Sequence, residues 1–226
     1  MEPAATQSLA GVLDSLNDAL FHGHDMPAAR KQQAALWIAA RQGQAGAYRG
    51  VLYAPTPDDR KLQVRLFTGE TVQSNAGLRC KLGFEAAAML VRLDVDVPAV
   101  RQAMERTYAG MHDRMLPHNE LGGTYCCGSC SVAYWRLLAA GGFTRAELRL
   151  KAGLEVLRQN RDGQGKWRRF PFYYTLLALS EMDLHNARNE LQYAARVCER
   201  LLKRKASPGI YGTRRAELVH KVLAQA

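Results

Sequence analysis

The sequence lacks the features that mark membrane-spanning and secreted proteins. It contains no apolar run near the roughly 18 residues that a membrane-spanning helix needs. Its N-terminal segment carries acidic side chains and no basic cluster, so it does not have the pattern of a secretory signal peptide. Without such a signal, the five cysteines are not expected to form a disulfide framework. We therefore expect a soluble, cytoplasmic protein with no membrane span.

The composition is that of a globular protein with an excess of positive charge. Hydrophobic residues make up 47% and charged residues 23%, which excludes wholesale disorder. Lys and Arg number 31 against 21 acidic residues, and the segment 188–226 holds much of the net charge of +10. A basic excess attracts nucleic acid, anionic lipid or phosphorylated small molecules, although a solvated helix face that carries Arg and Lys is the favoured explanation. The basic segment has no interleaved aromatics and no known motif, so specific nucleic-acid binding is not expected.

Hydrophobic periodicity predicts helices over most of the chain. The expected helices cover 6–21, 27–42, 74–92, a segment from Pro98 onward, 144–160 and 186–203. Asp96 is predicted to cap the helix at Pro98, and Thr144 to open its helix through a capping box with Glu147. The segment 49–69 reads as an irregular insertion or a short hairpin, with arms at 51–53 and 62–66.

A Gly-x-aromatic triplet recurs at four predicted helix boundaries. The triplets are Gly46–Tyr48, Gly123–Tyr125, Gly165–Trp167 and Gly209–Tyr211. Glycine permits the left-handed turn that ends a helix, and the ring can pack between neighbouring hairpins. A period in the forties with two helices per unit predicts stacked αα-hairpins. We therefore expect an all-α fold and a single domain over 1–226: an N-terminal helix in 1–26, then four repeats over 27–226 with the insertion 49–69. Three tryptophans are expected to be buried in its core: Trp37, Trp135 and Trp167.

Two stretches resemble repeats of the α/α-toroid proteins, the squalene and terpenoid cyclases and the β subunits of protein prenyltransferases. Leu154–Leu179 contains a helix that ends near Gln, an Asp-Gly-Gln-Gly-Lys-Trp loop and a following apolar helix, and Ala34–Tyr48 is similar. The resemblance implies a partial toroid of inner and outer helices around an apolar cavity. It also implies a transferase or cyclase acting on an apolar substrate with an anionic, diphosphate-like end. The stretch Tyr173-Tyr174-Thr175 matches a Tyr-His-Thr stretch of those prenyltransferases, so that Tyr174 stands where they carry a zinc-binding His.

The cysteines give the most specific indication of a chemical function in this sequence. Cys126, Cys127 and Cys130 cluster where a helix is expected to begin, and the amides of a helix N-terminus lower thiol pKa values. Cys127 and Cys130 have the commonest spacing of a thiolate chelate, and Cys80 is a candidate for a further ligand. Zinc is therefore the expected cofactor, if any. Tight packing of small apolar thiols and a redox or nucleophilic role for Cys127 or Cys130 remain open as alternatives.

Further polar residues are assigned to the same candidate site. Glu120 is a candidate acid or base beside the thiols. Five residues are candidates for holding an anionic substrate group: Arg79, Arg136, Arg168, Tyr173 and Tyr174. The starts of successive inner helices are expected to be neighbours at one rim, where their N-termini favour anions. The expected partners are a small apolar or anionic ligand and a second copy of the chain. A non-catalytic domain that binds a ligand or a protein is the alternative to an enzyme.

Overall fold

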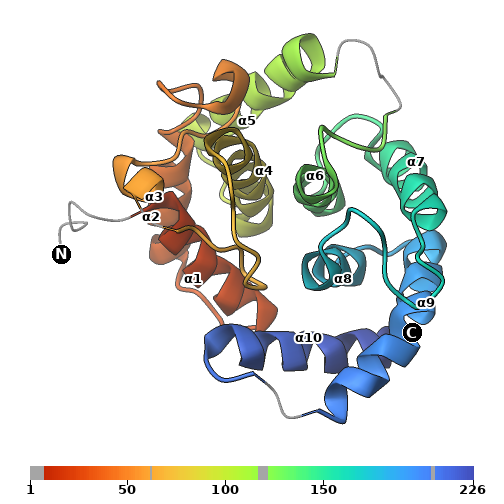
Figure 1. Ribbon diagram of the computed structural model, residues 1–226. Helices are drawn as coiled ribbons and strands as arrows, with labels where there is room; N and C mark the ends of the chain where they lie inside the picture. The colour runs from red at the N-terminus through yellow and green to blue at the C-terminus, as the bar shows by residue number, and fades with distance from the viewer. Residues whose placement is uncertain (1–7, 62, 117–121, 205–206) are drawn as a thin grey trace. The chain divides into compact units, whose positions relative to one another are not determined.

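The computed structural model describes residues 8–61, 63–116, 122–204 and 207–226, and in these residues the chain is all-α, as predicted. Ten α-helices lie in this part of the chain: α1 Leu9–Phe21, α2 Ala28–Ala39, α3 Pro57–Lys61, α4 Asn75–Leu93, α5 Pro98–Gly110, α6 Gly128–Ala140, α7 Ala146–Gln159, α8 Phe172–Ser180, α9 His185–Leu202 and α10 Ile210–Gln225 (Figure 1). Short 3₁₀ and π-helical turns occupy Tyr48–Gly50 and Met111–Met115. No helix among the described residues combines the length and the apolarity needed to cross a membrane.

The helices fall into two compact units. The first takes the described parts of 1–66, 71–120 and 140–143, and the second takes 67–70, 121–139 and 144–226. The first unit thus holds α1 to α5, and the second holds α6 to α10 with the short segment 67–70 from the insertion. A single repeat domain and a partial toroid stay predictions.

Helix α4 is the centre of the first unit. It packs against α1, α2 and α5 and is buried along nearly all of its length. It begins where Ser74 accepts a hydrogen bond from the backbone N–H of Gly77 at 3.1 Å, which satisfies one of the free donors of the first turn. Gly83 allows Leu52 to lie directly on the helix, because an added Cβ would come within 2.6 Å of the Leu52 side chain. The small residues of α4 therefore set how closely the insertion approaches the core.

Asp59 ties the insertion to the first helix. Its carboxylate accepts hydrogen bonds from the backbone N–H groups of Leu9 at 3.0 Å and Ala10 at 2.9 Å, which open α1. The same carboxylate accepts from the backbone N–H of Thr56 at 2.7 Å and from its hydroxyl at 2.8 Å. The side chain is 1% exposed. One buried carboxylate thus caps α1 and closes the turn that begins α3.

The insertion is irregular and does not contain the expected hairpin. Its two expected arms do not pair with each other among the described residues: Tyr53 forms an isolated bridge with Gln42, and Arg65 forms one with Thr71. Helix α3 takes up the middle of the segment, because the run Pro57-Asp-Asp-Arg-Lys61 has proline in the first turn followed by acidic side chains. The hairpin prediction is wrong, and the irregular reading of 49–69 is confirmed.

Two predicted caps are also wrong, although the helices begin where expected. Val97 is the N-cap of α5 and Arg145 that of α7, and neither forms a side-chain cap. Asp96 instead lies 3.3 Å from Arg101 in an exposed ion pair. The N-cap position of α7 is taken by Arg145, which has a left-handed backbone conformation. Thr144 lies one residue before this position, so its hydroxyl does not cap the helix. The Pro98 signal and the apolar periodicity therefore located these helices without a capping side chain.

The glycines of the four triplets are required for two different reasons, a positive φ or a close contact. Gly46, Gly165 and Gly209 have positive φ values of 94°, 92° and 86°, which favour glycine, but the expected left-handed turn at the end of a helix is wrong for Gly209, because this residue is the N-cap of α10 and has a ψ of 172°. Gly123 has no such conformation. It is needed for a close approach, because a Cβ on Gly123 would lie 1.9 Å from the backbone nitrogen of Gly153 in α7.

In the second unit, α6 and α8 are the apolar helices, and α9 and α10 pack beside α8. Trp135 on α6 is fully buried and stacks on Phe170 with ring centroids 5.4 Å apart. Its indole N–H donates to the backbone carbonyl of Gly123. Trp167 is 4% exposed, as predicted, and donates to Glu190 at 2.8 Å. Trp37, in the first unit, is less completely buried than the other two tryptophans and keeps part of its surface exposed.

We predict that Asp59→Asn destabilises the first unit by about 1–3 kcal/mol, because the amide leaves buried N–H donors without an acceptor. The midpoint of urea unfolding, followed by circular dichroism, measures the change. The neighbouring Asp58→Asn is the control, since Asp58 forms an exposed ion pair with Lys61 at 3.4 Å. Equal midpoints for the two variants would contradict the role given to Asp59.

Candidate functional site

The second unit places three cysteine thiols at the start of α6. Cys126 and Cys127 are exposed just before the helix, and Cys130 is buried in its first turn. The Sγ atoms of Cys126 and Cys130 lie within 4.8 Å of each other. All five cysteines of the chain are free thiols. Cys80 lies on α4 in the first unit, so its part in a site with these three thiols stays a prediction.

A serine holds the turn that carries the exposed cysteines. The hydroxyl of Ser131 donates to the backbone carbonyl of Cys127 at 2.9 Å and accepts from the backbone N–H of Tyr125 at 2.8 Å. The backbone N–H of Ser131 also donates to Cys127 at 2.8 Å. These bonds close a loop across Cys126 and Cys127. The two thiols are therefore presented by a fixed backbone rather than by a freely moving loop.

The expected lowering of the thiol pKa is wrong for Cys127. Burial raises the pKa of this thiol, and the neighbouring sulfurs of Cys130 and Cys126 raise it further because a second negative charge is unfavourable beside them. The amides at the start of α6 do not outweigh these effects. The Cys127 thiol therefore favours its protonated form until a positive group, such as a metal ion, stabilises the thiolate.

Helix α6 begins against the segment that leads into α8. An added Cβ on Gly128 would lie 2.1 Å from the backbone oxygen of Arg169 and 3.2 Å from the Cα of Phe170. Figure 1 shows α6 and α8 side by side and nearly end-on. The start of α6, directly after Cys126 and Cys127, therefore lies against the residues that lead into α8.

A carboxylate of the chain itself occupies the N-terminus of α8. Glu70 accepts a hydrogen bond from the backbone N–H of Tyr174 at 3.1 Å, and the hydroxyl of Thr68 donates to its other oxygen. Arg215 on α10 donates to the backbone carbonyl of Thr68 at 2.7 Å and lies 4.7 Å from the centre of the Tyr173 ring. The favourable place for an anion at this helix start is therefore filled by Glu70.

Arg136 has a partner within the second unit and does not face a ligand. It is 1% exposed, and its Nε and Nη2 atoms each lie 2.8 Å from an oxygen of Glu181. Glu181 follows the last turn of α8, so this bidentate pair joins α6 to α8 at the end away from the cysteines. Tyr174 is fully buried, which leaves it no surface for a substrate group.

The other predicted residues are spread over the chain. Arg168 is exposed in the loop before α8, and its backbone N–H donates to Asn160 at 2.8 Å. Arg79 lies in the second turn of α4, in the first unit. Glu120 lies outside the described residues. Among the predicted substrate-binding groups of the second unit, Arg168 and the half-buried Tyr173 are thus the two with exposed surface.

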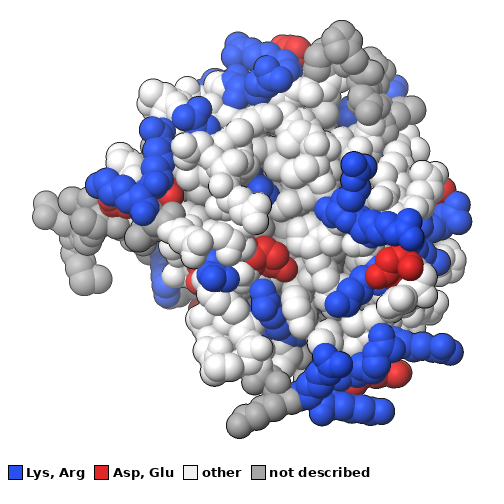
Figure 2. Space-filling view, viewed as in Figure 1, with Lys and Arg blue, Asp and Glu red and all other residues white. Residues whose placement is uncertain are grey.

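The basic segment 188–226 divides into an exposed part and a buried part. Arg196, Arg200, Lys203 and Arg204 are exposed on α9 and just beyond it, and Figure 2 shows basic side chains gathered at the lower right, where α9 ends in Figure 1. Arg214 is 3% exposed and donates to the backbone carbonyl of Phe67 at 3.4 Å. Part of the positive charge therefore stabilises the fold of the second unit.

The chain matches no protein-family model, no curated protein and no solved structure. The resemblance to the α/α-toroid proteins therefore rests on the motif residues alone. Sequence reasoning missed the role of Glu70, which no local pattern indicates, because its partner Tyr174 lies 104 residues away.

We predict that Gly128→Ala destabilises the second unit by about 1–3 kcal/mol, because the methyl group would press on the backbone at Arg169. Urea unfolding followed by tryptophan fluorescence measures the loss. Ser129→Ala, at the next position of the same helix start, is the matched control and should unfold close to the unchanged protein. A Gly128→Ala protein as stable as this control would refute the close approach.

Glu181→Gln should lower the stability by about 3 kcal/mol, because it leaves the buried charge of Arg136 without its counter-ion. Arg136→Met added to Glu181→Gln should recover part of the loss, since no unpaired charge then remains. The unfolding midpoints of the single and the double variant test this. The exposed pair of Arg158 and Glu155, 2.7 Å apart, is the control, and Glu155→Gln should leave the midpoint nearly unchanged.

Proposed function

We propose that the protein binds a metal ion, zinc in the first place, through the thiolates of Cys126, Cys127 and Cys130. The observation that supports this most directly is the separation of the Cys126 and Cys130 sulfurs, which is below 4.8 Å. Two sulfurs on one tetrahedral zinc lie about 3.8 Å apart, given Zn–S bonds of about 2.3 Å. A small side-chain rotation therefore brings both onto one ion.

The donor chemistry fits such an ion. Thiolates are soft ligands that suit zinc, and metal binding draws protons from thiols whose pKa is otherwise raised. Cys127 and Cys126 are exposed, so the ion would have a route of entry from solvent. Tyr174 cannot replace the histidine of the prenyltransferases, because it is fully buried and its ring is not a zinc ligand of the usual kind. Cys80, a substrate atom or water would complete the set.

We further propose that this centre serves a prenyltransferase- or cyclase-like reaction on an apolar substrate with an anionic end. Zinc, when bound, supplies a Lewis acid and lowers the pKa of a coordinated thiol or water. Arg168 is exposed in the loop before α8 and is the residue we assign to the anionic end of the substrate. Arg136 is excluded from that role by its pairing with Glu181.

The alternative is a non-catalytic domain in which the metal holds the start of α6 and the protein binds a ligand or a protein partner. Two observations favour it: Glu70 fills the anion position at α8, and the ion pair of Arg136 faces the interior. Incubation of the zinc-loaded protein with an isoprenoid diphosphate separates the two. Release of diphosphate supports the enzyme, and zinc retention without turnover supports the alternative.

Metal analysis of the purified protein tests the centre itself. We expect about one zinc per chain, and at least a tenfold weaker affinity in Cys130→Ser and in Cys126→Ser, since each loses one thiolate. Cys198→Ser is the matched control, because this buried thiol lies on α9 and should not change the zinc content. Cys80→Ser shows whether the predicted further ligand takes part. Zinc content that is nil, or equal in all variants, would overturn the proposal.

A further inference from the structure

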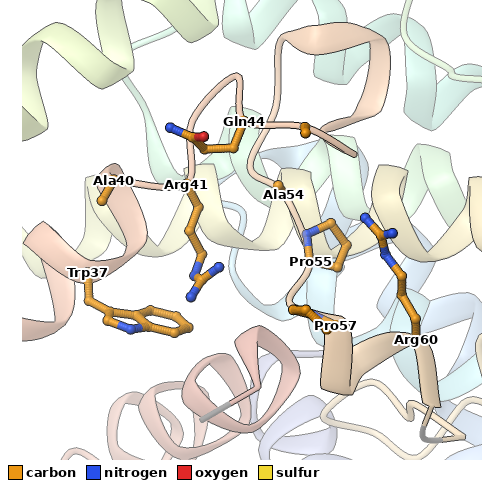
Figure 3. Close-up of a pocket in the computed structure, with 9 residues that line it drawn as sticks. Trp37, Ala40, Arg41, Gln44, Ala54, Pro55, Pro57 and Arg60 are labelled. Atoms are coloured by element: carbon orange, nitrogen blue, oxygen red, sulfur yellow. The ribbon is translucent and has the colours of Figure 1, made fainter. Parts of the chain in front are cut away.

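The first unit carries a hollow that is independent of the cysteines. Its volume is about 530 Å³, and it lies between the end of α2, the turn that follows and the start of α3. Figure 3 shows the indole of Trp37 along one wall and Pro55 and Pro57 along the other. Such flat apolar surfaces are typical of sites that hold the body of a small molecule.

Arg41 brings a positive charge with an unused hydrogen-bond donor into this hollow. Its guanidinium lies 3.9 Å from the centre of the Trp37 ring. Its Nε atom is buried and has no hydrogen-bond partner. Burial lowers the pKa of Arg41, and the nearby charge of Asp59 offsets only part of that effect. A buried donor without an acceptor is rare in folded proteins and marks a place where an acceptor of a ligand would fit.

Arg60 adds a second guanidinium to the same hollow from α3. Gly46 makes room for it, because a Cβ on Gly46 would lie 2.2 Å from the Arg60 Nη2 atom. Neither Arg41 nor Arg60 forms an ion pair with a carboxylate in the described part of the chain. Asp59 lies between them in the sequence, but its carboxylate is taken by the hydrogen bonds that open α1 and α3.

We propose that this hollow binds a small molecule with a flat apolar body and one anionic group, a carboxylate or a phosphate. The apolar body lies against the part of the Trp37 ring that the Arg41 guanidinium does not cover, and against the two prolines. The anionic group accepts hydrogen bonds from the guanidinium of Arg41, whose Nε donor has no partner within the protein, and Arg60 adds a second positive charge to the lining of the hollow. Charge-assisted hydrogen bonds to arginine are strong in a partly desolvated site. We therefore expect the hollow to distinguish ligands mainly by whether they carry the anionic group.

Isothermal titration calorimetry with naphthalene carboxylate, its neutral carboxamide and naphthyl phosphate tests the proposal. The carboxamide has the same shape as the carboxylate and lacks the charge. We expect the better of the two anions to bind at least about tenfold more tightly than the carboxamide. The comparison of carboxylate with phosphate identifies which anion the arginines prefer.

Variants then locate the binding. Arg41→Met and Arg60→Met should each weaken the anions by about tenfold and leave the carboxamide unchanged. Trp37→Leu should weaken all three probes, because the stacking surface is lost. Arg30→Met is the matched control, since Arg30 is exposed on α2 and does not line the hollow. Circular dichroism confirms that each variant is folded.

Three results would overturn the proposal: no binding of any probe at millimolar concentration, equal affinity for carboxylate and carboxamide, or anion affinities unchanged in both arginine variants. Cys130→Ser should bind the probes as the unchanged protein does. This last comparison keeps the hollow distinct from the metal centre, so that failure of one proposal leaves the other to be judged on its own measurements.

Discussion

The second unit depends on two places where backbone segments lie so close together that only glycine fits. At Gly128 the start of α6 lies against the backbone of Arg169, and at Gly123 the preceding segment lies against Gly153 of α7. A side chain at either glycine would push the helices apart by more than the packing of an interior tolerates. The hydrogen bond from Trp135 to Gly123 and the turn closed by Ser131 both lie beside these contacts. The position of the thiols therefore depends on glycine at these two positions, because neither Gly123 nor Gly128 has a side chain.

Periodicity predicted the helices because an apolar stripe on one face is a local property. The leucines of α1 and the stripe of α9 are visible in any window of a few turns, and both helices begin and end within a few residues of the expected positions. The caps were missed because Val97 and Arg145 begin their helices without a side-chain bond. Proline in the first turn of α5 and the apolar spacing predicted these helices without a capping side chain.

Parts of the candidate site were beyond prediction, since their partners are distant in the sequence. The clustering of cysteines was visible as three residues in five, but the pairing of Arg136 with Glu181 spans 45 residues. Trp37 illustrates a different limit. An apolar residue on an amphipathic helix indicates burial, yet a large ring at the edge of the stripe can equally line an open hollow. Composition does not separate these two environments.

The segment 67–70 has a consequence for synthesis on the ribosome. Phe67 and Thr68 are held by Arg214 and Arg215, which follow them by 147 residues in each case. The segment leaves the ribosome early and has no partners to bind until α10 has been synthesised. Closing so long a loop is slow compared with forming a helix. The second unit therefore reaches its final packing only after translation of its last helix, and a ribosome-bound chain would expose the apolar ring of Phe67 until then.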